Sequence, residues 1–453
     1  MKALSVEMRL QIAAGSEMGK GNAEIAREVG CSVGAVRKWR RRMKRDGQRV
    51  ALMSARGGRT KRGVLSTFET GLVDRLKYMR EGHPGWGSKT LLAELRRDAS
   101  LASMDLPARS SVARWLRSQE YAQRYQRHQP LPDAACPTEV PIPHQMWELD
   151  ARGQEYVPEV GVIQLININD VCSRAKVMSY PCLLSPPGGR TLCRRPSQLD
   201  YQLALRLAFA QWGLPQAVSL DHDPVFVDAS SKSPFPMLLH LWLIGLGVRV
   251  HFIRTHCPTD HGQTERSHQT WYRQALQGQH YATWSGLFAT LCERRQFLNW
   301  HLPCTPLGER PPLHAWPAAF HSGRRYHPAH EDRLFDMQRV FAFLSDPNAR
   351  WLRGVRANGT VSLGGQIYLL GRAWRGHTVE IRFDPVDQHL IFLNPNIDSP
   401  DQTQRQPIRD LTPEVLLGDI TMLYRVQPFQ LRLPFDPDAI RVSRICETLG
   451  VMN

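Results

Sequence analysis

Three acidic residues are candidates for metal-assisted chemistry on a phosphodiester. Asp150 ends the run Trp-Glu-Leu-Asp, Asp221 directly follows a short apolar run, and Glu265 stands in Pro-Thr-Asp-His-Gly-Gln-Thr-Glu-Arg. Carboxylate oxygens are the ligands that Mg²⁺ prefers in proteins, and two such ions about 4 Å apart can activate an attacking oxygen and stabilise a leaving one. The chain has 42 acidic residues, most of them expected on solvated surface, so this interpretation depends on context.

The apolar pattern around these acids predicts the elements that carry them. Alternation with period two places Asp150 on the strand face opposite to the apolar residues before it. Asp221 comes at the carboxyl edge of a buried strand, where ligand sites of α/β sheets gather, and Glu265 rides the first turns of a helix. The pattern predicts strands near 145–151, 161–168, 175–181, 216–220 and 248–253, and helices near 197–212, 236–246 and 260–278.

Other residues of the last predicted helix are candidates for DNA contact. Gln269 and Tyr272 follow Glu265 by about one and two turns and share its face. Contact with DNA and plain surface solvation are equally compatible with that spacing. Arg266, next to the acid, is a further candidate for DNA contact.

Charge and cysteine usage limit the function classes. The 58 Lys and Arg against 42 Asp and Glu give a net charge of +16, and residues 1–62 alone hold 16 basic and 5 acidic residues. Such a local excess predicts a polyanionic partner. Apolar runs stay below the roughly 18 residues of a membrane span, and the polar N-terminus lacks a signal-peptide pattern. Nine Cys without a Cys-x-x-Cys pair argue for a reducing compartment and against disulfides and a zinc module.

The N-terminal residues 1–47 are predicted to form a helix-turn-helix DNA-binding domain. Its two helices cover 22–29 and 32–43, with Gly30 in the turn and Ser32 as N-cap. In such a motif the second helix enters the major groove. A charged, solvated helix is the alternative interpretation. The predicted DNA-contacting residues on the second helix are Ser32, Arg37, Lys38, Arg40 and Arg41.

The rest of the chain divides at changes in composition. Residues 48–66 form a Gly-rich basic linker in which Arg59, Lys61 and Arg62 can lie along a groove. A second helix-turn-helix unit is expected at 67–119. It is followed by a polar linker at 120–143, a catalytic core at 144–330, a small five-stranded β-barrel at 331–398 and a tail at 399–453. On the barrel, phosphate contact and scattered surface charge are equally compatible with Arg353, Arg356, Arg372, Arg375 and Arg382.

Several sequence blocks, in their order along the chain, resemble the retroviral-integrase-like DDE transposases of bacterial insertion sequences. The blocks are Trp147-Glu-Leu-Asp150, Asp170-Val-Cys-Ser-Arg174, Trp212-Gly-Leu-Pro215, Leu220-Asp-His-Asp-Pro-Val-Phe226, Leu246-Gly-Val248, and the segment from Pro258 to Arg266. The resemblance implies a multidomain α and α/β protein: N-terminal helix-turn-helix units, an RNase H-like core and a C-terminal SH3-like β-barrel. It implies that Asp150, Asp221 and Glu265 bind two Mg²⁺ or Mn²⁺ ions.

The same resemblance implies a transposase that binds transposon ends and joins a 3′-hydroxyl to target DNA. Its implied partners are double-stranded DNA and further copies of itself on paired ends. An ATPase targeting protein is a candidate partner whose need the sequence does not decide, and the expected location is the bacterial cytoplasm, in association with the nucleoid. The family has Asn-Gly after the second acid, whereas this chain has His222-Asp223, so Asp221 and Asp223 are both candidates for the second ligand. Residues 228–236 look like an inserted polar loop. The main alternative function is a catalytically inactive, sequence-specific DNA-binding protein derived from a transposase, and a third is an RNase H-like nuclease.

Overall fold

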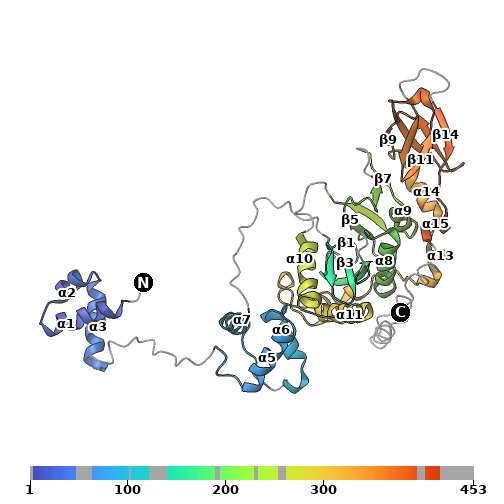
Figure 1. The fold of residues 1–453 in the computed structure, drawn as a ribbon. Coiled ribbons are helices and arrows are strands. Elements are labelled where there is room, and N and C mark those ends of the chain that lie inside the picture. The colour runs from blue at the N-terminus through green and yellow to red at the C-terminus, as the bar shows by residue number, and fades with distance from the viewer. Residues whose placement is uncertain are drawn as a thin grey trace. The chain divides into compact units, whose positions relative to one another are not determined.

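The computed structural model describes residues 4–46, 64–101, 104–121, 140–188, 194–228, 233–253, 262–394 and 403–418. Contacts divide the chain into two units. One comprises residues 1–73 and 110–122, and the other comprises 74–109 and 123–453 (Figure 1). This division separates residues that the sequence analysis placed in a single domain at 67–119.

The first unit begins with three helices, α1 (Val6–Glu17), α2 (Asn22–Val29) and α3 (Val33–Asp46). Ile12 of α1 packs with Ile25, Val29 and Val36 of the two predicted helices. Gly30 ends α2 with a left-handed φ of 68°, as the predicted turn requires. Helix α1 was not predicted, because its apolar residues are spread around the helix and give little amphipathic signal.

Four helical segments follow: α5 (Thr70–Gly82), α6 (Ser88–Arg97), the 3₁₀ turn η1 (Ala99–Leu101) and α7 (Arg109–Ser118). Apart from Val73, which is half-buried, the apolar stripes predicted for this region are buried. They comprise Leu72, Leu76, Met79, Leu91, Leu92, Leu95, Val112, Trp115 and Leu116.

A mixed sheet forms the centre of the second unit; five of its six described strands overlap the predicted ones, whereas β2 was not predicted. The strands are β1 (Trp147–Ala151), β2 (Glu155–Val157), β3 (Gly161–Asp170), β4 (Lys176–Ser185), β5 (Ala217–Leu220) and β8 (Arg249–Phe252). Residues 166–169 of β3 pair antiparallel with both β1 and β4, so those two strands flank β3. On its other side, β1 pairs in parallel with β5, and β5 pairs in parallel with β8.

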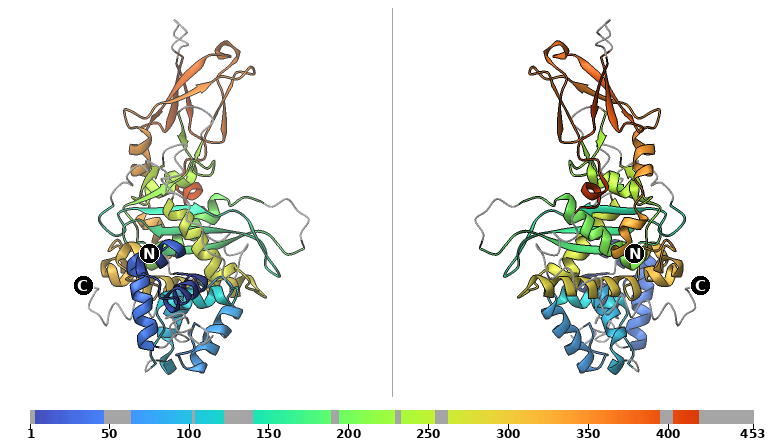
Figure 2. Two further views of the ribbon diagram at one scale, coloured as in Figure 1. Left: turned by 90° about the vertical axis from the view of Figure 1, so that its left-hand side faces the viewer. Right: turned by 90° about the vertical axis from the view of Figure 1, so that its right-hand side faces the viewer.

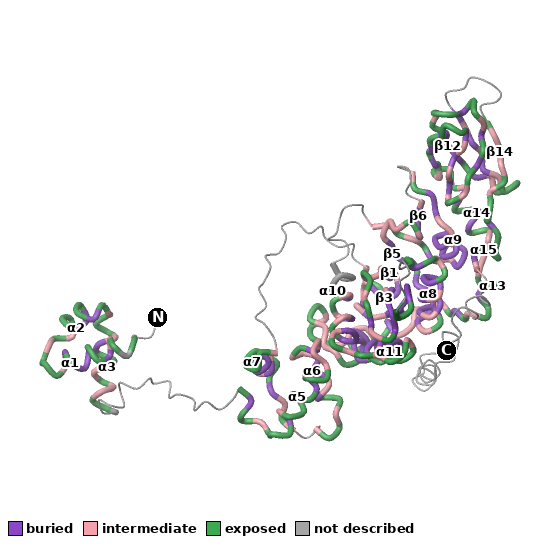
Figure 3. The backbone as a smooth tube through the Cα atoms, viewed as in Figure 1, coloured by how far each residue is buried: buried purple, intermediate pink, exposed green. Residues whose placement is uncertain are grey.

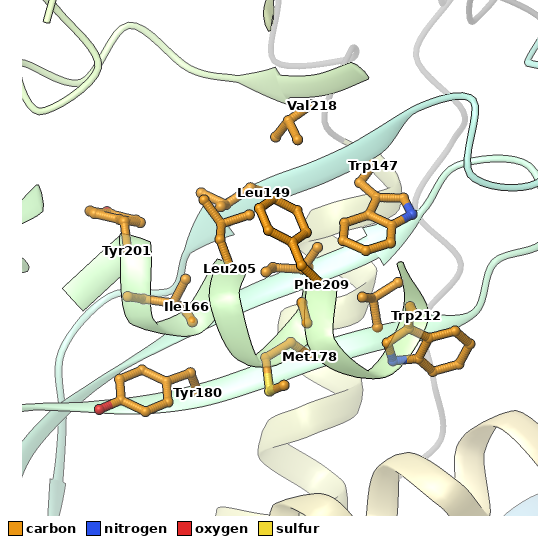
Figure 4. Close-up of a cluster of buried hydrophobic side chains, with 14 of the residues drawn as sticks. Trp147, Leu149, Ile166, Met178, Tyr180, Tyr201, Leu205, Phe209, Trp212 and Val218 are labelled. Atoms are coloured by element: carbon orange, nitrogen blue, oxygen red, sulfur yellow. The ribbon is translucent and has the colours of Figure 1, made fainter. Parts of the chain in front are cut away.

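Helices cover both faces of this sheet. Helices α8 (Gln198–Trp212) and α9 (Leu238–Gly245) share one apolar cluster with Trp147, Leu149 and Val218, and Figure 4 shows the α8 side chains against those strands. The second cluster joins β3 to Trp271 and to helix α11 (Trp284–Trp300). Trp271 ends α10 (Gly262–Trp271), which continues as a π-helical turn, η3 (Tyr272–Leu276). Figure 3 shows the burial of α8, α9 and α11.

Short elements lead from α11 to the barrel: η4 (Thr305–Leu307), α12 (Pro312–Ala315), η5 (Pro317–Phe320), η6 (Pro328–His330), α13 (Glu331–Leu334) and α14 (Met337–Leu344). The strands of the C-terminal β region, called the barrel below after its predicted form, are β9 (Trp351–Gly354), β10 (Thr360–Leu363), β11 (Gln366–Leu369), β12 (Thr378–Asp384), β13 (His389–Leu393) and β14 (Thr403–Pro407), with η7 (Arg372–Trp374) between β11 and β12 and α15 (Pro413–Leu417) after β14. They form a four-stranded sheet, β14-β13-β12-β9, and a two-stranded sheet, β10-β11, which is one described strand more than expected. The region expected as a barrel at 331–398 begins with α13 and α14, and its first strand starts at Trp351. Strand β14 adds to β13 beyond the expected end at 398.

The inserted segment 228–236 connects the core to the barrel. Its described residues form the short strands β6 (Val227–Asp228) and β7 (Phe235–Pro236). The ring of Phe235 meets that of Trp351 with centroids 4.9 Å apart, and Phe235 belongs to the barrel's apolar cluster. In the described part of the chain, no helix is long and apolar enough to cross a membrane.

Candidate active site

Asp150 lies in β1, and Asp221 directly follows β5, the parallel neighbour of β1. The paired residues are Trp147 with Val218 and Glu148 with Ser219, and extension of this register by two residues beyond the paired ones would bring Asp150 level with Asp221. Partners at the same level of adjacent strands lie about 5 Å apart and project to the same face of a sheet. Leu149 is fully buried, whereas 26% of the Asp150 side chain is exposed. The predicted orientation of Asp150, away from the apolar face, is therefore confirmed.

Tyr201 of α8 indicates that negative charge converges here. Its pKa is raised, first by burial of the phenol and then by the charges of Asp223, Asp221 and Asp150. Carboxylates on three different chain positions thus act on one hydroxyl group. Unless a cation balances them, such neighbouring acids repel one another.

The loop after β5 carries both candidates for the second ligand. The backbone N–H of Asp223 donates to Oδ1 of Asp221 at 3.2 Å, and Oδ1 of Asp223 accepts from the N–H of Val225 at 2.9 Å. His222 stacks on Phe252, and its Nε2 lies 2.9 Å from the carbonyl oxygen of Ile253. Both acids therefore bond to the backbone in the same way, and they differ in position: Asp221 directly follows the strand, and Asp223 lies two residues into the loop.

Residues of helix α10 contact Asp150 and the neighbouring strands. Nε2 of His268 lies 3.6 Å from Oδ2 of Asp150. Ser267 Oγ donates to Oδ1 of Asn169 at 2.9 Å, and the Lys176 ammonium donates to both of these atoms at 2.9 and 3.0 Å. Burial lowers the pKa of Lys176 to about 8. These contacts fasten α10 to β1, β3 and β4.

Glu265 lies in α10 one turn before His268. Its backbone is helical, as predicted, and its side chain is outside the described residues. The helix positions of Glu265, His268 and Gln269 share a face by their spacing.

A surface pocket of about 360 Å³ is lined by Arg152, His268, Gln269, Tyr272, Arg273 and Gln277. It is linked to Asp150 through His268, whose Nε2 lies 3.6 Å from the carboxylate. The guanidinium of Arg152 stacks over the Tyr272 ring, 4.6 Å from its centroid, and also pairs with Glu155. Gln269 and Tyr272, which the sequence predicted on the face of Glu265, thus meet in one pocket with two arginines.

The site carries ligand atoms of the right chemistry for Mg²⁺. Asp150 and Asp221 supply hard carboxylate oxygens from rigid strand ends. Among the side chains that the structure describes, no group of three or more His, Cys, Asp or Glu forms a metal cluster; the described set lacks the Glu265 carboxylate. Asp150 and Asp221 are thus two of the three carboxylates that the sequence analysis predicted as ligands, and the third, Glu265, has its side chain outside the described residues.

Comparison with known proteins gives no family. No family model matches the sequence. Similar solved structures include the HTLV-2 integrase catalytic core domain in complex with magnesium (trimeric form), which is 13% identical, with a TM-score of 0.28 over 38% of this chain and 97% of that chain. A simian T-cell lymphotropic virus intasome in complex with PP2A regulatory subunit B56 gamma is 15% identical, with a TM-score of 0.29 over 70% and 96%. The catalytic core domain of BIV integrase is 14% identical, with a TM-score of 0.26 over 39% and 95%. Similarity at this level does not identify the function of this protein.

The predicted DNA-binding residues of α3 differ in their surroundings. Arg37, Lys38 and Arg41 are exposed. Ser32 Oγ accepts from the N–H of Ala35 at 3.2 Å, which confirms it as N-cap. Arg40 instead donates to Oδ1 of Asn22 at 2.8 Å and to the Lys20 carbonyl, so part of its guanidinium ties α3 to α2.

The remaining predicted contacts fall in three places. Arg59, Lys61 and Arg62 lie outside the described residues. Arg266 is exposed on α10. The suggestion that Arg353 binds DNA phosphates was wrong, because Arg353 is 4% exposed and pairs with Asp228. The sequence carried a signal for this: Arg353 lies two residues after buried Trp351 on one strand and therefore shares its inward face.

The block from Asp170 to Arg174 has a structural role. It is the turn between β3 and β4, and the buried Asp170 carboxylate accepts from the N–H groups of His144 and Ser173 at 2.7 and 2.8 Å. Sequence reasoning missed His268, Lys176 and Arg273 as members of the site. Their helix and strand positions could be predicted, but their meeting depends on how α10 packs on the sheet.

Proposed function

We propose that this protein is a DNA transposase or integrase of the DDE type, with a polynucleotidyl-transferase centre at Asp150, Asp221 and Glu265. Two observations support the proposal. The register of β1 with β5, when extended, brings Asp150 level with Asp221, and His268 of α10 contacts Asp150. Mg²⁺ or Mn²⁺, bound in a pair, would lower the pKa of the attacking oxygen and stabilise the leaving one. The mixed sheet, with three antiparallel strands followed by two parallel ones, supports an RNase H-like core.

The residues of the chain have distinct parts in this proposal. Asp150, Asp221 and Glu265 are the metal ligands, and His268 orients Asp150. The pocket next to them offers Arg152 and Arg273 to phosphate oxygens and Gln269 and Tyr272 to the end of a DNA strand. In this proposal double-stranded DNA has two roles: one duplex provides the attacking 3′ end, and a second duplex is the target.

Sequence-specific binding is assigned to the N-terminal unit. Exposed Arg37, Lys38 and Arg41 lie on α3 after a left-handed turn at Gly30, which supports a helix-turn-helix with α3 in the major groove. We further propose that the helices within 67–119, although divided between the two units, also bind DNA. The C-terminal β region is proposed to be an SH3-like barrel, and several copies of the chain are proposed to assemble on paired ends. A requirement for an ATPase partner stays a prediction of the family resemblance.

The proposal is tested by strand transfer with Mg²⁺ or Mn²⁺. Labelled DNA that carries the end sequences of the mobile element encoding this protein is joined to plasmid DNA. Wild type is expected to join ends, whereas Asp150→Asn, Asp221→Asn and Glu265→Gln are expected to bind DNA and join none. Asp223→Asn is the matched control: we assign the ligand role to Asp221, which directly follows β5, so Asp223→Asn, two residues further into the loop, should retain joining. Loss of joining only in Asp223→Asn would make Asp223 the second ligand. Wild type that binds ends and never joins them would favour the inactive DNA-binding alternative.

A further inference from the structure

The residues that follow the pocket on α10 are packed against helix α6. Thr90 Oγ1 accepts from Nε2 of Gln274 at 2.9 Å, and Ala93 shares an apolar cluster with Trp271 and Ala275. Gln274 and Ala275 belong to the π-helical turn whose first residues, Tyr272 and Arg273, line the pocket. Figures 1 and 2 both show α6 beside α11. One short turn therefore faces the pocket on one side and α6 on the other.

Arg294 of α11 lies at the centre of this contact. It is 3% exposed, and its guanidinium donates to Oε1 of Glu94 at 2.5 Å and to Oε1 of Gln274 at 2.8 Å. It is also stacked between the rings of Trp86 and Phe297, 4.5 and 3.9 Å from their centroids. Planar hydrogen bonding and stacking of this kind require arginine rather than lysine. Arg294 thus joins α6, the π-helical turn, the Trp86 turn and α11.

Two glycines allow the backbones to approach closely. A Cβ added to Gly85 would lie 2.1 Å from the carbonyl oxygen of Arg273, and one added to Gly278 would lie 2.9 Å from Pro84 Cγ. The turn before α6 therefore rests directly on the backbone of a pocket residue. Gln279 Nε2 reinforces the contact by donating to the Gly82 carbonyl at 2.9 Å.

Two charged side chains of α6, Lys89 and Glu94, contact other parts of the second unit. Lys89 pairs with Glu309 at 2.8 Å and donates to Thr305 Oγ1 at 2.9 Å. Glu94 holds Arg294 on one oxygen and Arg97 on the other, at 2.5 and 2.9 Å. Lys89 and Glu94 therefore link α6 to the segment around Thr305 and to α11.

We propose that Arg294 is a positioning residue of the active site, through which the segment from Gly82 to Arg97 holds the π-helical turn and so places Tyr272 and Arg273 beside Asp150. The inference rests on the proposed function of that pocket. A π-helical turn contains one residue more than the α-helix it interrupts and occurs mostly at functional sites. If it relaxed to an α-helix, residues on either side would turn relative to each other by about 100°. The contact with α6 prevents this rotation.

The experiment compares full-length wild type with Glu94→Gln, Arg294→Lys and Gly85→Ala. Gly82→Ala is the matched control, because nothing lies within 4 Å of a Cβ at Gly82. Amide hydrogen exchange is measured in peptides covering 266–281, with α8 as the reference helix. Joining is measured as a maximal rate at saturating end DNA and as the DNA concentration that gives half of that rate. Thermal unfolding selects the variants that retain the fold.

In the folded variants, exchange at 272–279 should accelerate while exchange in α8 stays as in wild type. The maximal joining rate should fall about tenfold to a hundredfold, as expected for misplaced active-site groups, whereas the half-saturating DNA concentration stays within about twofold. Unchanged exchange and joining in every folded variant would overturn the inference, and so would an equal loss in Gly82→Ala. If wild type joins no DNA, the proposed function fails, and the exchange measurement still decides whether the segment holds the turn.

Discussion

Nε2 of His268 lies 3.6 Å from Oδ2 of Asp150, so the helix that carries Glu265 touches the strand that carries the first acid. A group that orients a metal ligand typically changes metal affinity or activity by 10- to 100-fold on removal. We expect His268→Ala to raise the Mg²⁺ concentration for half-maximal joining about tenfold. Gln277→Ala is the control, since Gln277 lines the same pocket. An identical metal requirement in both variants would contradict this role.

The buried network of Lys176, Asn169 and Ser267 should contribute to stability. Removal of the Ser267 hydroxyl takes one hydrogen-bond partner from Lys176 and one from Asn169. Ser267→Ala is expected to lower the free energy of unfolding by about 1 to 3 kcal/mol, the contribution of a hydrogen bond to a charged group, while Lys176 and Asn169 keep the bond between them. Urea unfolding measures it, with Thr270→Ala as the control, because the Thr270 hydroxyl bonds only within its own helix. Equal stabilities of the two variants would count against the network.

His240 should make the core sensitive to acid. It is 7% exposed in α9, between the rings of Phe252 and Phe343, and burial lowers its pKa from 6.5 to about 4. As the pH falls from 6.5 towards 4, the unfolded chain binds a proton that the folded protein does not. The neutral His240 ring therefore makes its full contribution to the free energy of unfolding above pH 6.5. This contribution is lost as the pH falls from 6.5 towards 4, by about 3 kcal/mol in total.

Replacement of His240 tests this linkage. In His240→Phe the difference in melting temperature between pH 7.5 and pH 5 should be smaller than in wild type. His251→Phe is the control, because His251 is exposed. If wild type and His240→Phe lose stability in parallel, the acid sensitivity arises elsewhere.

The ion pair of Arg353 and Asp228 should hold the barrel to the core. Arg353 donates to the Ser233 carbonyl at 2.6 Å and approaches Asp228 Oδ2 at 3.4 Å, which also accepts from the N–H of Gly364. Loss of one partner from a buried pair costs about 3 to 5 kcal/mol. Asp228→Ala should therefore expose the barrel to limited proteolysis, and Arg353→Met combined with Asp228→Leu should restore part of the resistance. Full resistance of Asp228→Ala would show that the pair is dispensable.

The arginines of α3 should differ in their effect on DNA binding. Arg37→Ala and Arg41→Ala are expected to reduce the slope of log affinity against log salt by about 1 each, since each exposed guanidinium is assigned to a phosphate. Arg40→Ala should mainly lower the melting temperature of the N-terminal helices, because it removes the bond to Asn22. A uniform salt slope in all three variants would contradict the placement of α3 on DNA.

Local patterns predicted the elements that carry the site. Alternation along β1 predicted the side of the sheet on which Asp150 lies, because side chains of a strand alternate strictly. The parallel register with β5 was not predictable, since it depends on pairing between residues 71 positions apart along the chain. The π-helical turn left no local signal either, because it is accommodated by contacts with α6. The segment 228–236 was expected to be an inserted polar loop without a packing role. The structure shows that it packs on the barrel, because Phe235 belongs to the barrel's apolar cluster.

That docking defines which parts of this protein can be exchanged with those of another. Phe235 completes the apolar interior of the barrel, and Asp228 neutralises an arginine inside it, although both residues precede the barrel by more than 100 positions. A chimaera that receives only residues 337–418 from a donor would place a foreign barrel on an unmatched loop. The transferable module consists of two separate pieces of sequence, the barrel and the segment 228–236.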